Sequence, residues 1–363
     1  MEQLERKTFW KYKTNTSIRI MSQIIHPDFK LNGKSFTYIE LLSEALYLKE
    51  NGQLFEKEIG KFLIDWLSNE SFVFVQTSGS TGIPKQIVLQ KLAMIASAKA
   101  TGLFFNLQPK NTALLCLSAN YIAGKMMLVR AITLGLHLDT IDPTSAPLST
   151  KKYSFIAMVP LQVQKSLSKL HLVDSVLIGG AKVSYTLSES ILKTNCNAFE
   201  SYGMTETISH IAIKKIGAKA FTVLPNVIIS VDERNCLVIE ALELSMEKIT
   251  TNDIVEILNA TQFILKGRID NVINSGGIKI FPEEVEEILA KFISVPFFIA
   301  SKPDEILGEK VILVLEATPF AIDNSVFSEL SKYQIPKEIL FLKSFVRTET
   351  QKINRKKSLE KLV

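Results

Sequence analysis

Cysteine and histidine are both scarce in this sequence of 363 residues. It has 3 cysteines and 4 histidines, and none of them forms a CxxC pair or a close cluster. A disulfide framework needs paired cysteines and a zinc site needs clustered ligands, so we expect neither. The sequence also lacks a GxSxG elbow, which disfavours a Ser–His hydrolase. This composition predicts a protein of the reducing cytoplasm.

Long apolar runs are absent as well. No uncharged apolar stretch approaches the length of about 18 residues that a membrane span needs. The charged N-terminus, MEQLERKTFWKYK, lacks the apolar core of a signal peptide. The net charge is small, because 42 basic and 37 acidic side chains give +5. That excess suits anionic small molecules and is too weak to indicate nucleic acid. We therefore expect neither a membrane span nor a nucleic-acid partner.

The sequence does have a long alternation of short β-like runs and longer helical stretches. Runs such as Phe72–Val75, Thr112–Leu117 and Phe155–Met158 are rich in β-branched or aromatic residues. Between them, Leu92–Phe105 and Lys125–Leu134 place apolar residues near the helical spacing of 3.6. This alternation predicts an α/β fold with mixed sheets covered by helices.

The pattern changes after a polar joint with the sequence KGRID. A helix that starts with proline and acidic residues follows, then two strand-like runs and a helix near Asn324–Tyr333. We expect a large core domain over residues 1–266 and a small α+β C-terminal domain over residues 267–363. The length and the hydrophobic content of 47% are sufficient for two cores.

A loop rich in glycine and hydroxyl residues follows the first of these β-like runs. Its glycines allow the backbone to turn tightly around a phosphate, and its hydroxyls and N–H groups can donate to phosphate oxygens. It matches neither GxxxxGK[ST] nor GxGxxG, and a purely structural turn is the alternative. The loop comprises Thr77, Ser78, Gly79, Ser80, Thr81, Gly82, Ile83, Pro84 and Lys85.

Several further segments combine residue types that suit a nucleotide. One places an aromatic ring, a hydroxyl and a carboxylate together, which could stack a base, donate to a phosphate and hold Mg²⁺. It comprises Ser201, Tyr202, Gly203, Met204, Thr205, Glu206 and Thr207. The others, in chain order, are Gly179, Gly180 and Ala181, then Asp253, Arg268 and Asp270, then Gly276 and Gly277, and finally Lys352 in a basic segment.

This ordered set resembles the acyl-adenylate-forming superfamily, which includes acyl-CoA ligases, adenylation domains and luciferase-like enzymes. The resemblance covers Ser71–Arg355. It implies a core domain with a small mobile domain, ATP and Mg²⁺ as cofactors, a carboxylic acid as substrate and coenzyme A as the acceptor. The family's cores usually have roughly a hundred more residues before the loop, so the resemblance also implies a trimmed N-terminal part.

The resemblance also implies the roles of the catalytic residues. The loop Thr77–Lys85 would clamp the β- and γ-phosphates of ATP, and Tyr202 would stack on adenine. Thr205 would bond the α-phosphate, Glu206 would bind Mg²⁺, and Lys352 would be the catalytic lysine. A bound cation and a placed ammonium suit this chemistry, because negative charge builds on the phosphoryl oxygens in the transition state.

Other matched positions would shape the rest of the site. By resemblance, Asp253 and Arg268 hold the ribose, and Gly179–Ala181 floor the adenine and acyl sites. Asp270 matches the hinge of the family, and Gly276–Gly277 match the wall of the pantetheine tunnel. A rotation at the hinge would exchange the contacts needed for adenylation for those needed for thioester formation.

Two positions depart from the family pattern. Gln351 stands where a glycine usually precedes the lysine, which would make that segment less flexible. Asn252 stands where a glycine usually precedes the aspartate. Asn tolerates positive φ, so we expect it to be accommodated there.

The compact length and the stretch around Tyr121 most resemble the o-succinylbenzoate–CoA ligases of menaquinone biosynthesis. Tyr121, Gly124 and Lys125 would then lie at the acyl pocket. Lys125 or Arg130 could pair with the second carboxylate of a dicarboxylic acid. Alternatively, both are solvated charges on a helix. His210 either lines the pocket or is a satisfied core or surface histidine.

Other functions remain open from the sequence. An enzyme that loads a carrier protein would look alike, and so would a ligase for another acyl or aryl acid. A non-catalytic relative that only binds nucleotide is disfavoured by the intact Glu206, Arg268 and Lys352. The basic tail could suggest RNA, but no aromatic platform accompanies it. The oligomeric state is left open.

Overall fold

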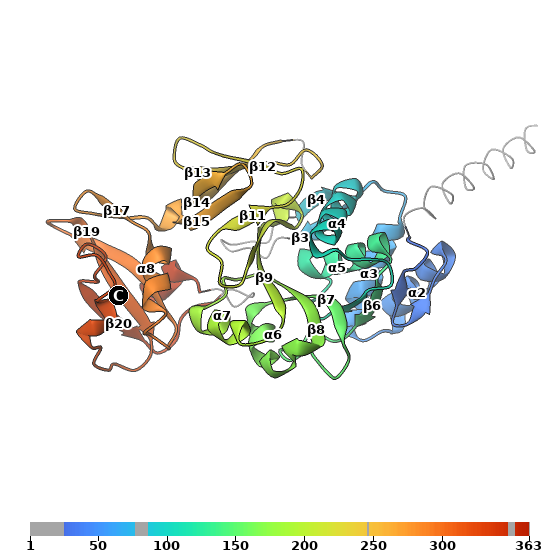
Figure 1. The fold of residues 1–363 in the computed structure, drawn as a ribbon, viewed down its shortest axis with the longest axis horizontal. Coiled ribbons are helices and arrows are strands. Elements are labelled where there is room, and N and C mark those ends of the chain that lie inside the picture. The colour runs from blue at the N-terminus through green and yellow to red at the C-terminus, as the bar shows by residue number, and fades with distance from the viewer. Residues whose placement is uncertain (1–24, 77–85, 245–246, 348–352, 363) are drawn as a thin grey trace, which may run out of the picture.

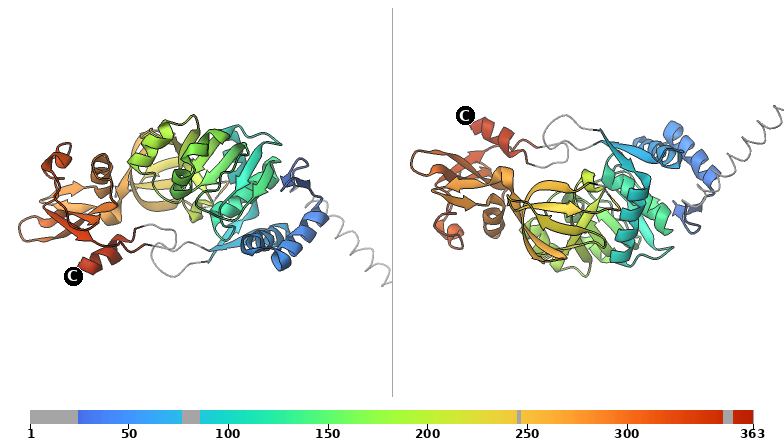
Figure 2. Two further views of the ribbon diagram at one scale, coloured as in Figure 1. Left: turned by 90° about the horizontal axis from the view of Figure 1, so that it is seen from below. Right: turned by 90° about the horizontal axis from the view of Figure 1, so that it is seen from above.

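The computed structural model describes residues 25–76, 86–244, 247–347 and 353–362. Figure 1 shows two bodies along the long axis of the molecule. The larger contains the described chain up to Arg268 and a large sheet, and the smaller contains the C-terminal strands and helices at the opposite end from the N-terminal helices. The two further views in Figure 2 show the same separation.

The large body is built on a sheet of 13 strands whose two halves differ in direction. In the parallel half, the order is β1 (Lys30–Leu31), β6 (His137–Thr140), β5 (Thr112–Leu115), β7 (Tyr153–Met158), β8 (Val173–Ile178) and β9 (Asn197–Gly203). β2 (Lys34–Ser35) pairs antiparallel with β1 at the edge.

The other half of this sheet is antiparallel and begins at β9. Its order is β10 (His210–Lys215), β11 (Phe221–Val223), β15 (Gln262–Arg268), β14 (Ile249–Asn259), β13 (Cys236–Glu240) and β12 (Ile228–Val231). Strand β9 is therefore the junction of the two halves. Ligands of open α/β sheets bind beyond the carboxyl ends of strands where the order changes, so this end of β9 is the place to look for a site.

Helices cover both faces of the parallel half, as the alternation in its strands requires. Leu115, Phe155 and Leu177 belong to the core with the helices α2 (Tyr38–Asn51), α3 (Leu54–Leu67), α4 (Lys91–Phe105) and α5 (Ile122–Leu134). Neighbouring residues of the same strands, such as Ile156 and Ile178, belong to the core with α6 (Pro160–Lys165), the 3₁₀ segment Leu167–Leu172 and α7 (Tyr185–Leu192). The α/β fold predicted from the sequence is confirmed.

Local signals fix the ends of these helices. α2 begins with a capping box, in which the Thr37 hydroxyl accepts from the Glu40 N–H at 3.4 Å and the Glu40 carboxylate accepts from the Thr37 N–H at 2.8 Å. α5 ends at Gly135, whose φ of 73° places it in the left-handed region that favours glycine. The buried Lys91 ammonium joins two helices, because it donates to the Ser68 carbonyl at the end of α3 at 2.8 Å.

A separate two-stranded hairpin precedes α4. β3 (Phe72–Gln76) pairs antiparallel with β4 (Gln86–Gln90), with Gln76 opposite Gln86. The glycine-rich loop predicted from the sequence connects these two strands and lies outside the described residues. The strands fix both ends of that loop.

The small body has its own sheet and its own core. Its sheet has the order β17 (Ile278–Ile280), β16 (Ile273–Ser275), β19 (Gly308–Glu316) and β18 (Phe297–Asp304), with β20 (Glu338–Leu342) parallel to β19. α8 (Pro282–Leu289) packs in one cluster of buried residues and α9 (Arg355–Leu359) in another. The members of both clusters come from residues 273–362.

The helix expected near Asn324–Tyr333 is wrong. The structure has only the 3₁₀ turn Asn324–Phe327 in this region, with Asp323 capping it through a hydrogen bond from the Ser325 N–H at 2.8 Å. Serines recur at 325, 328 and 331, and serine competes with helical hydrogen bonds through its own side chain. In the ranges that the structure describes, no helix combines the length and apolarity of a membrane span.

Candidate active site

The two segments Gly179–Ala181 and Ser201–Gly203 lie side by side because β8 and β9 are parallel neighbours. Ile178, the last residue of β8, is in register with Glu200 of β9. The Ser201 hydroxyl donates to the Ile178 carbonyl at 3.0 Å. A Cβ on Gly179 would lie 2.8 Å from that hydroxyl oxygen, so glycine allows this close approach. Two of the sequence-predicted segments are thus brought together at the carboxyl edge of the sheet.

A tight turn follows β9 and carries Thr205 and Glu206. A Cβ on Gly203 would lie 2.3 Å from the Ser209 carbonyl oxygen, so the chain closes on itself here. The Thr207 hydroxyl accepts from the Met204 N–H at 2.9 Å and donates to a carbonyl within the turn. Ile208 has a φ of 67°, which is strained for a β-branched residue. Such strain persists only where the surroundings impose it, and it accumulates at functional sites.

The turn leaves Glu206 exposed on the molecular surface. Neither a hydrogen bond nor an ion pair joins its carboxylate to any other residue within the described ranges. Thr205 is partly exposed. A free carboxylate can bind Mg²⁺ through its oxygens, and a neighbouring hydroxyl can donate a hydrogen bond to a phosphate oxygen. The described ranges contain no group of three or more His, Cys, Asp or Glu side chains that could hold a metal by themselves. One carboxylate with water and phosphate oxygens is a common way for proteins to bind Mg²⁺.

Tyr202, Asp253 and Arg268 form one hydrogen-bonded group. The Tyr202 hydroxyl donates to the Asp253 carboxylate at 2.6 Å, and Arg268 donates to its other oxygen at 3.2 Å. Asp253 and Arg268 are opposite each other in the β14–β15 pair. Burial, with Asp253 alongside, raises the pKa of the Tyr202 phenol, so it remains a donor. The Tyr202 ring packs against Phe263 and Phe221, with centroid distances of 5.3 and 5.8 Å.

Arg268 also connects this group to the expected hinge. Its second amino group donates to Asp270 at 2.9 Å. The Asn252 side-chain amide donates to both oxygens of Asp270 at 3.4 Å, and Arg234 donates to the Asn252 side-chain oxygen, Oδ1, at 3.3 Å. Asn252 lies within strand β14 and is not among the positive-φ residues, so the conformational reason expected for its tolerance is wrong. It is accommodated as an ordinary strand residue with a side-chain bond to Asp270.

Two predicted elements lie outside the described residues. They are the phosphate loop Thr77–Lys85 and the catalytic lysine, Lys352, together with its neighbour Gln351. The residues next to the lysine segment are held firmly. Arg347 and Ile353 form an antiparallel bridge, and Arg347 makes an ion pair with Glu316.

The residues expected at the acyl pocket lie at the start of α5. Tyr121 is the residue before the helix and is exposed. A Cβ on Gly124 would lie 2.2 Å from the Ser118 carbonyl oxygen, so the preceding loop crosses the helix closely. The Lys125 ammonium donates to the carbonyls of Ala119 and Asn120 at 2.6 and 2.8 Å. Lys125 therefore fastens this loop, and burial lowers its pKa to about 8.

Arg130 lies in the middle of α5 and is 2% exposed. The alternative that Lys125 and Arg130 are solvated helix charges is wrong, because both are buried. Arg130 donates to the Ser209 hydroxyl at 2.8 Å and to the Thr101 hydroxyl at 3.2 Å. None of the ion pairs formed by the described residues includes its guanidinium. Sequence reasoning missed Thr101 and Ser209, although a charge inside the apolar run KMMLVRAITL was a signal for such partners.

The glycines Gly276 and Gly277 form the two-residue turn between β16 and β17. Both have positive φ, of 57° and 81°, as the tight primed hairpin turns require. The turn is by itself a sufficient structural reason for glycine at both positions. A place in a pantetheine tunnel remains a proposal.

Comparison with known proteins gives a consistent result. The sequence profile of the AMP-binding enzyme family matches residues 32–235. A 2-succinylbenzoate–CoA ligase of Listeria monocytogenes is 25% identical over 400 aligned positions, which cover 99% of this chain and 85% of the relative.

Solved structures match as well, and two of them are informative. An acyl-CoA synthetase (AMP-forming)/AMP-acid ligase II-like protein from Dyadobacter fermentans is 35% identical, with a TM-score of 0.60 over 88% of this chain and 98% of that chain. O-succinylbenzoate coenzyme A synthetase (MenE) from Bacillus subtilis, in complex with ATP and magnesium ion, has the same fold. Its TM-score is 0.76 at 15% identity, over 94% of this chain and 99% of that one. The family profile covers more than half of the sequence, and the chain therefore belongs to the AMP-binding enzyme family.

Proposed function

We propose that this protein activates 2-succinylbenzoate with ATP and transfers the acyl group to coenzyme A, a reaction of menaquinone biosynthesis. The relative from Listeria monocytogenes carries the name of that ligase, and its alignment covers almost the whole chain. Among the described residues, the observation that carries the choice of acid is Arg130, a buried cation without a carboxylate partner. The cysteines Cys116, Cys196 and Cys236 are all free, which supports a reducing compartment such as the cytoplasm.

The first half-reaction would take place at the carboxyl ends of β8 and β9. A substrate carboxylate attacks the α-phosphorus of ATP, and pyrophosphate leaves to give the acyl-adenylate. Thr205 would donate to the α-phosphate, and Gly179–Ala181 would form a flat floor for the adenine. Lys352 would bring a positive charge to the phosphoryl oxygens, on which charge builds in the transition state.

The free Glu206 fits a magnesium ligand. Its carboxylate is exposed and unpaired within the described ranges, and oxygen donors are the ligands that Mg²⁺ prefers. When bound, the cation would neutralise phosphate charge as the carboxylate and ATP approach each other. Thr77–Lys85 would hold the β- and γ-phosphates.

Asp253 and Arg268 would hold the ribose hydroxyls. In the structure Asp253 accepts hydrogen bonds from Tyr202 and Arg268, so a ribose would share or replace these donors. The largely buried Tyr202 ring, 8% exposed, would present its remaining free surface to adenine. Arg268 reaches Asp270 as well, and this links the nucleotide site to the segment where the chain leaves the large body.

The second half-reaction would need a different arrangement of the same parts. We place a core domain over residues 1–266 and a mobile domain over residues 267–363, with Asp270 at the hinge. The separate sheet and separate cores of the small body support this division. Rotation at the hinge would remove Lys352 and bring Gly276–Gly277 toward the pantetheine of coenzyme A.

Arg130 supports a substrate with a second carboxylate. A fully buried guanidinium is stabilised by an anion, and the paired geometry of carboxylate oxygens matches its donors. Its partner Ser209 lies four residues beyond Thr205 in the same turn segment, so the Arg130 guanidinium lies next to the site of adenylation. Fatty acids and simple aryl acids lack the group that would complete this pair.

A panel of acids with ATP, Mg²⁺ and coenzyme A tests this function. The panel contains 2-succinylbenzoate, benzoate, a medium-chain fatty acid and malonate, and the readout is formation of AMP and of the acyl-CoA. We expect 2-succinylbenzoate to have the highest kcat/KM by at least about tenfold, since one charge-assisted pair contributes that much or more. Higher kcat/KM for a fatty or simple aryl acid would contradict the assignment. Replacement of coenzyme A by a phosphopantetheinyl carrier protein identifies the acceptor.

A further inference from the structure

Four side chains from three parts of the sequence meet in the interior beside α5. Arg130 of α5 contacts Thr101 of α4, and it contacts Ser209 in the segment after the β9 turn. His210, at the start of β10, lies between these two hydroxyls. Its Nε2 is 3.5 Å from the Thr101 oxygen, and its Nδ1 is 3.1 Å from the Ser209 oxygen. Arg130 and His210 are both buried.

The hydroxyl of Thr101 fixes the direction of these hydrogen bonds. It donates its single proton to the Ser97 carbonyl at 2.9 Å, so toward Arg130 and His210 it can only accept. His210 must therefore carry a proton on Nε2 to make its contact with Thr101. Its Nδ1 is then the acceptor for the Ser209 hydroxyl, whose oxygen in turn accepts from Arg130. One arrangement of protons satisfies all four side chains.

This arrangement makes His210 a neutral imidazole. Burial, and then the nearby Arg130 charge, hold the pKa of His210 well below its usual range. A second proton on the ring would sit on Nδ1 and would break the acceptor role toward Ser209. Arg130 is thus held by two hydroxyls, and through them by a neutral ring.

The partners of Arg130 are uncharged, so its positive charge stays available to an incoming anion. An aspartate or glutamate in their place would neutralise the guanidinium, and a substrate carboxylate would have to displace it. Hydroxyl partners fix the position of the guanidinium and leave its positive charge uncompensated. They engage Nε and one Nη2 proton, and Nη1 has only the weak Met127 sulfur acceptor at 3.7 Å. Donors remain for an incoming anion.

We propose that Thr101, Ser209 and His210 form an uncharged clamp that positions the Arg130 guanidinium for the second, unreacted carboxylate of the substrate, an inference that rests on the proposed function. His210 is a positioning residue in this account. The cavity beside it has a volume of about 20 Å³. That is room for roughly one water molecule, so the acid would not contact His210 through this cavity, whose lining does not include Arg130.

The turn before Ser209 helps to hold this residue of the clamp in a fixed position. Ile208, directly before Ser209, is buried in the strained conformation described above. The Thr207 hydroxyl lies 2.7 Å from the Ser209 carbonyl oxygen and can hold it from the other side. Backbone strain of this kind persists only where neighbouring contacts impose a set position.

The test compares two substitutions of His210 on two kinds of substrate. His210→Leu fills the space without hydrogen bonds, whereas His210→Gln keeps one donor and one acceptor. The substrates are 2-succinylbenzoate and its two monoacid analogues, 4-oxo-4-phenylbutanoate and 2-butanoylbenzoate, of which the one that turns over is used. We expect His210→Leu to raise KM for the diacid about tenfold and KM for the monoacid less than about twofold. His210→Gln should restore most of the loss.

A parallel change in KM for both substrates would show a merely structural role and would overturn the proposal. So would a Gln variant no better than the Leu variant. If His210→Leu does not fold, Ser209→Ala removes the hydroxyl between Arg130 and His210 and should raise KM for the diacid selectively. Thr133→Val is the matched control, because Thr133 lies on α5 and its buried hydroxyl has no partner among the described residues. A wild-type enzyme that does not prefer the diacid would instead contradict the proposed function itself.

Discussion

The surroundings of Glu286 shift the pKa of its carboxyl in opposite directions. It lies on α8, where it accepts from the Ile299 N–H at 2.8 Å and from Arg355 at 2.9 Å. Burial raises the pKa of its carboxyl to about 7, although Arg355 and the Ile299 N–H oppose the rise, and Glu283 adds to it. Because the folded state holds this proton more tightly than the unfolded chain, the stability it contributes is present below pH 4.5. That contribution is lost as the pH rises through about 7.

This residue gives a prediction about stability and pH. We expect the thermal midpoint of the wild type, relative to that of Glu286→Gln, to fall as the pH rises from 5 to 7.5. In this range the unfolded wild type has already released the Glu286 proton that the folded state still binds, whereas the glutamine of the variant does not titrate. Scanning calorimetry or fluorescence at several pH values measures the difference. Glu284→Gln is the matched control, since it removes a carboxylate from the same helix beside Lys266 at 3.3 Å. Parallel curves for the wild type and the Glu286 variant would contradict the assignment.

At the same scale, the sequence identifies a residue more readily than its partners. Tyr202, Asp253 and Arg268 could be named from their segments, but their mutual hydrogen bonds depend on β9, β14 and β15 meeting in one sheet. Arg130 could be named from the sequence as a candidate partner for an anion, whereas Thr101 and Ser209 could not, because they lie 29 and 79 positions away from it. Hydrogen bonds over such separations leave no periodic signal in the sequence.

At the scale of elements, prediction succeeded where the pattern is local. The helices α4 and α5 coincide closely with the stretches indicated by apolar spacing, and the strand β7 with a run rich in β-branched and aromatic residues. The helix expected near Asn324–Tyr333 is wrong, because Asp323 caps the start of a single 3₁₀ turn and the serines that follow favour non-helical backbone conformations. The order of the 13 strands could not be predicted from the sequence, because the pairing of β11 with β15 joins segments that are separated by three other strands along the chain.

The change of direction at β9 explains why the site lies where it does. A parallel half supplies the adjacent carboxyl ends of β8 and β9, and an antiparallel half returns Asp253 and Arg268 to the same region. Tyr202, within β9, connects the two through its bond to Asp253. The sequence places these motifs in order along the chain, whereas only the sheet places them together.

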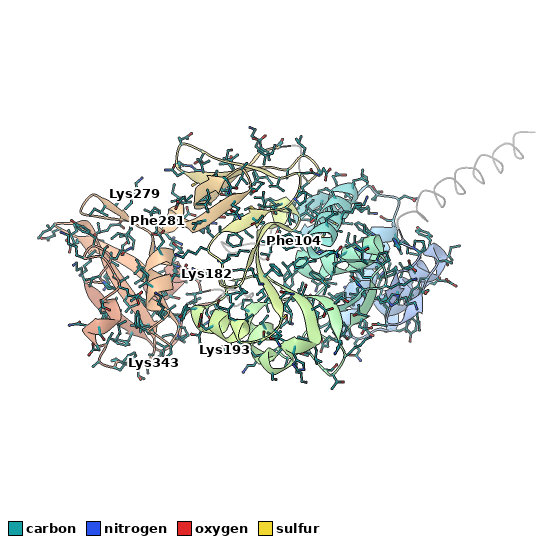
Figure 3. The ribbon with its side chains drawn as sticks, in the orientation of Figure 1. Phe104, Lys182, Lys193, Lys279, Phe281 and Lys343 are labelled. Carbon is teal, nitrogen blue, oxygen red and sulfur yellow. The ribbon has the colours of Figure 1, made fainter. Side chains whose placement is uncertain are left out.

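At the scale of the whole molecule, an ion pair links the two bodies. Lys182, the residue after Ala181, lies 3.0 Å from Glu287 of α8. Figure 3 labels Lys182 on the side of the large body that faces α8. Rotation at Asp270 would separate this pair. The contact therefore favours the orientation seen here, by about 0.2–1 kcal/mol as expected for exposed partners.

A charge reversal tests this link. Glu287→Lys should change the ratio of the two half-reaction rates, adenylation and thioester formation, by up to about fivefold, because it destabilises one orientation only. The double variant Lys182→Glu, Glu287→Lys restores the pair with opposite signs and should return the ratio toward the wild type. Stopped-flow measurement of each half-reaction supplies both rates. A double variant no closer to the wild type than either single variant would rule out the link.

The proposed function depends on activation of the acid through an adenylate. Its most direct test is the exchange of labelled pyrophosphate into ATP in the presence of 2-succinylbenzoate and Mg²⁺ and without coenzyme A. We expect exchange only when the acid is present, and we expect Lys352→Ala to lower its rate by about 100-fold or more, as loss of a transition-state charge partner does. Acid-independent exchange, no exchange in a wild type that still forms the thioester, or a Lys352→Ala variant within tenfold of the wild type would contradict the account.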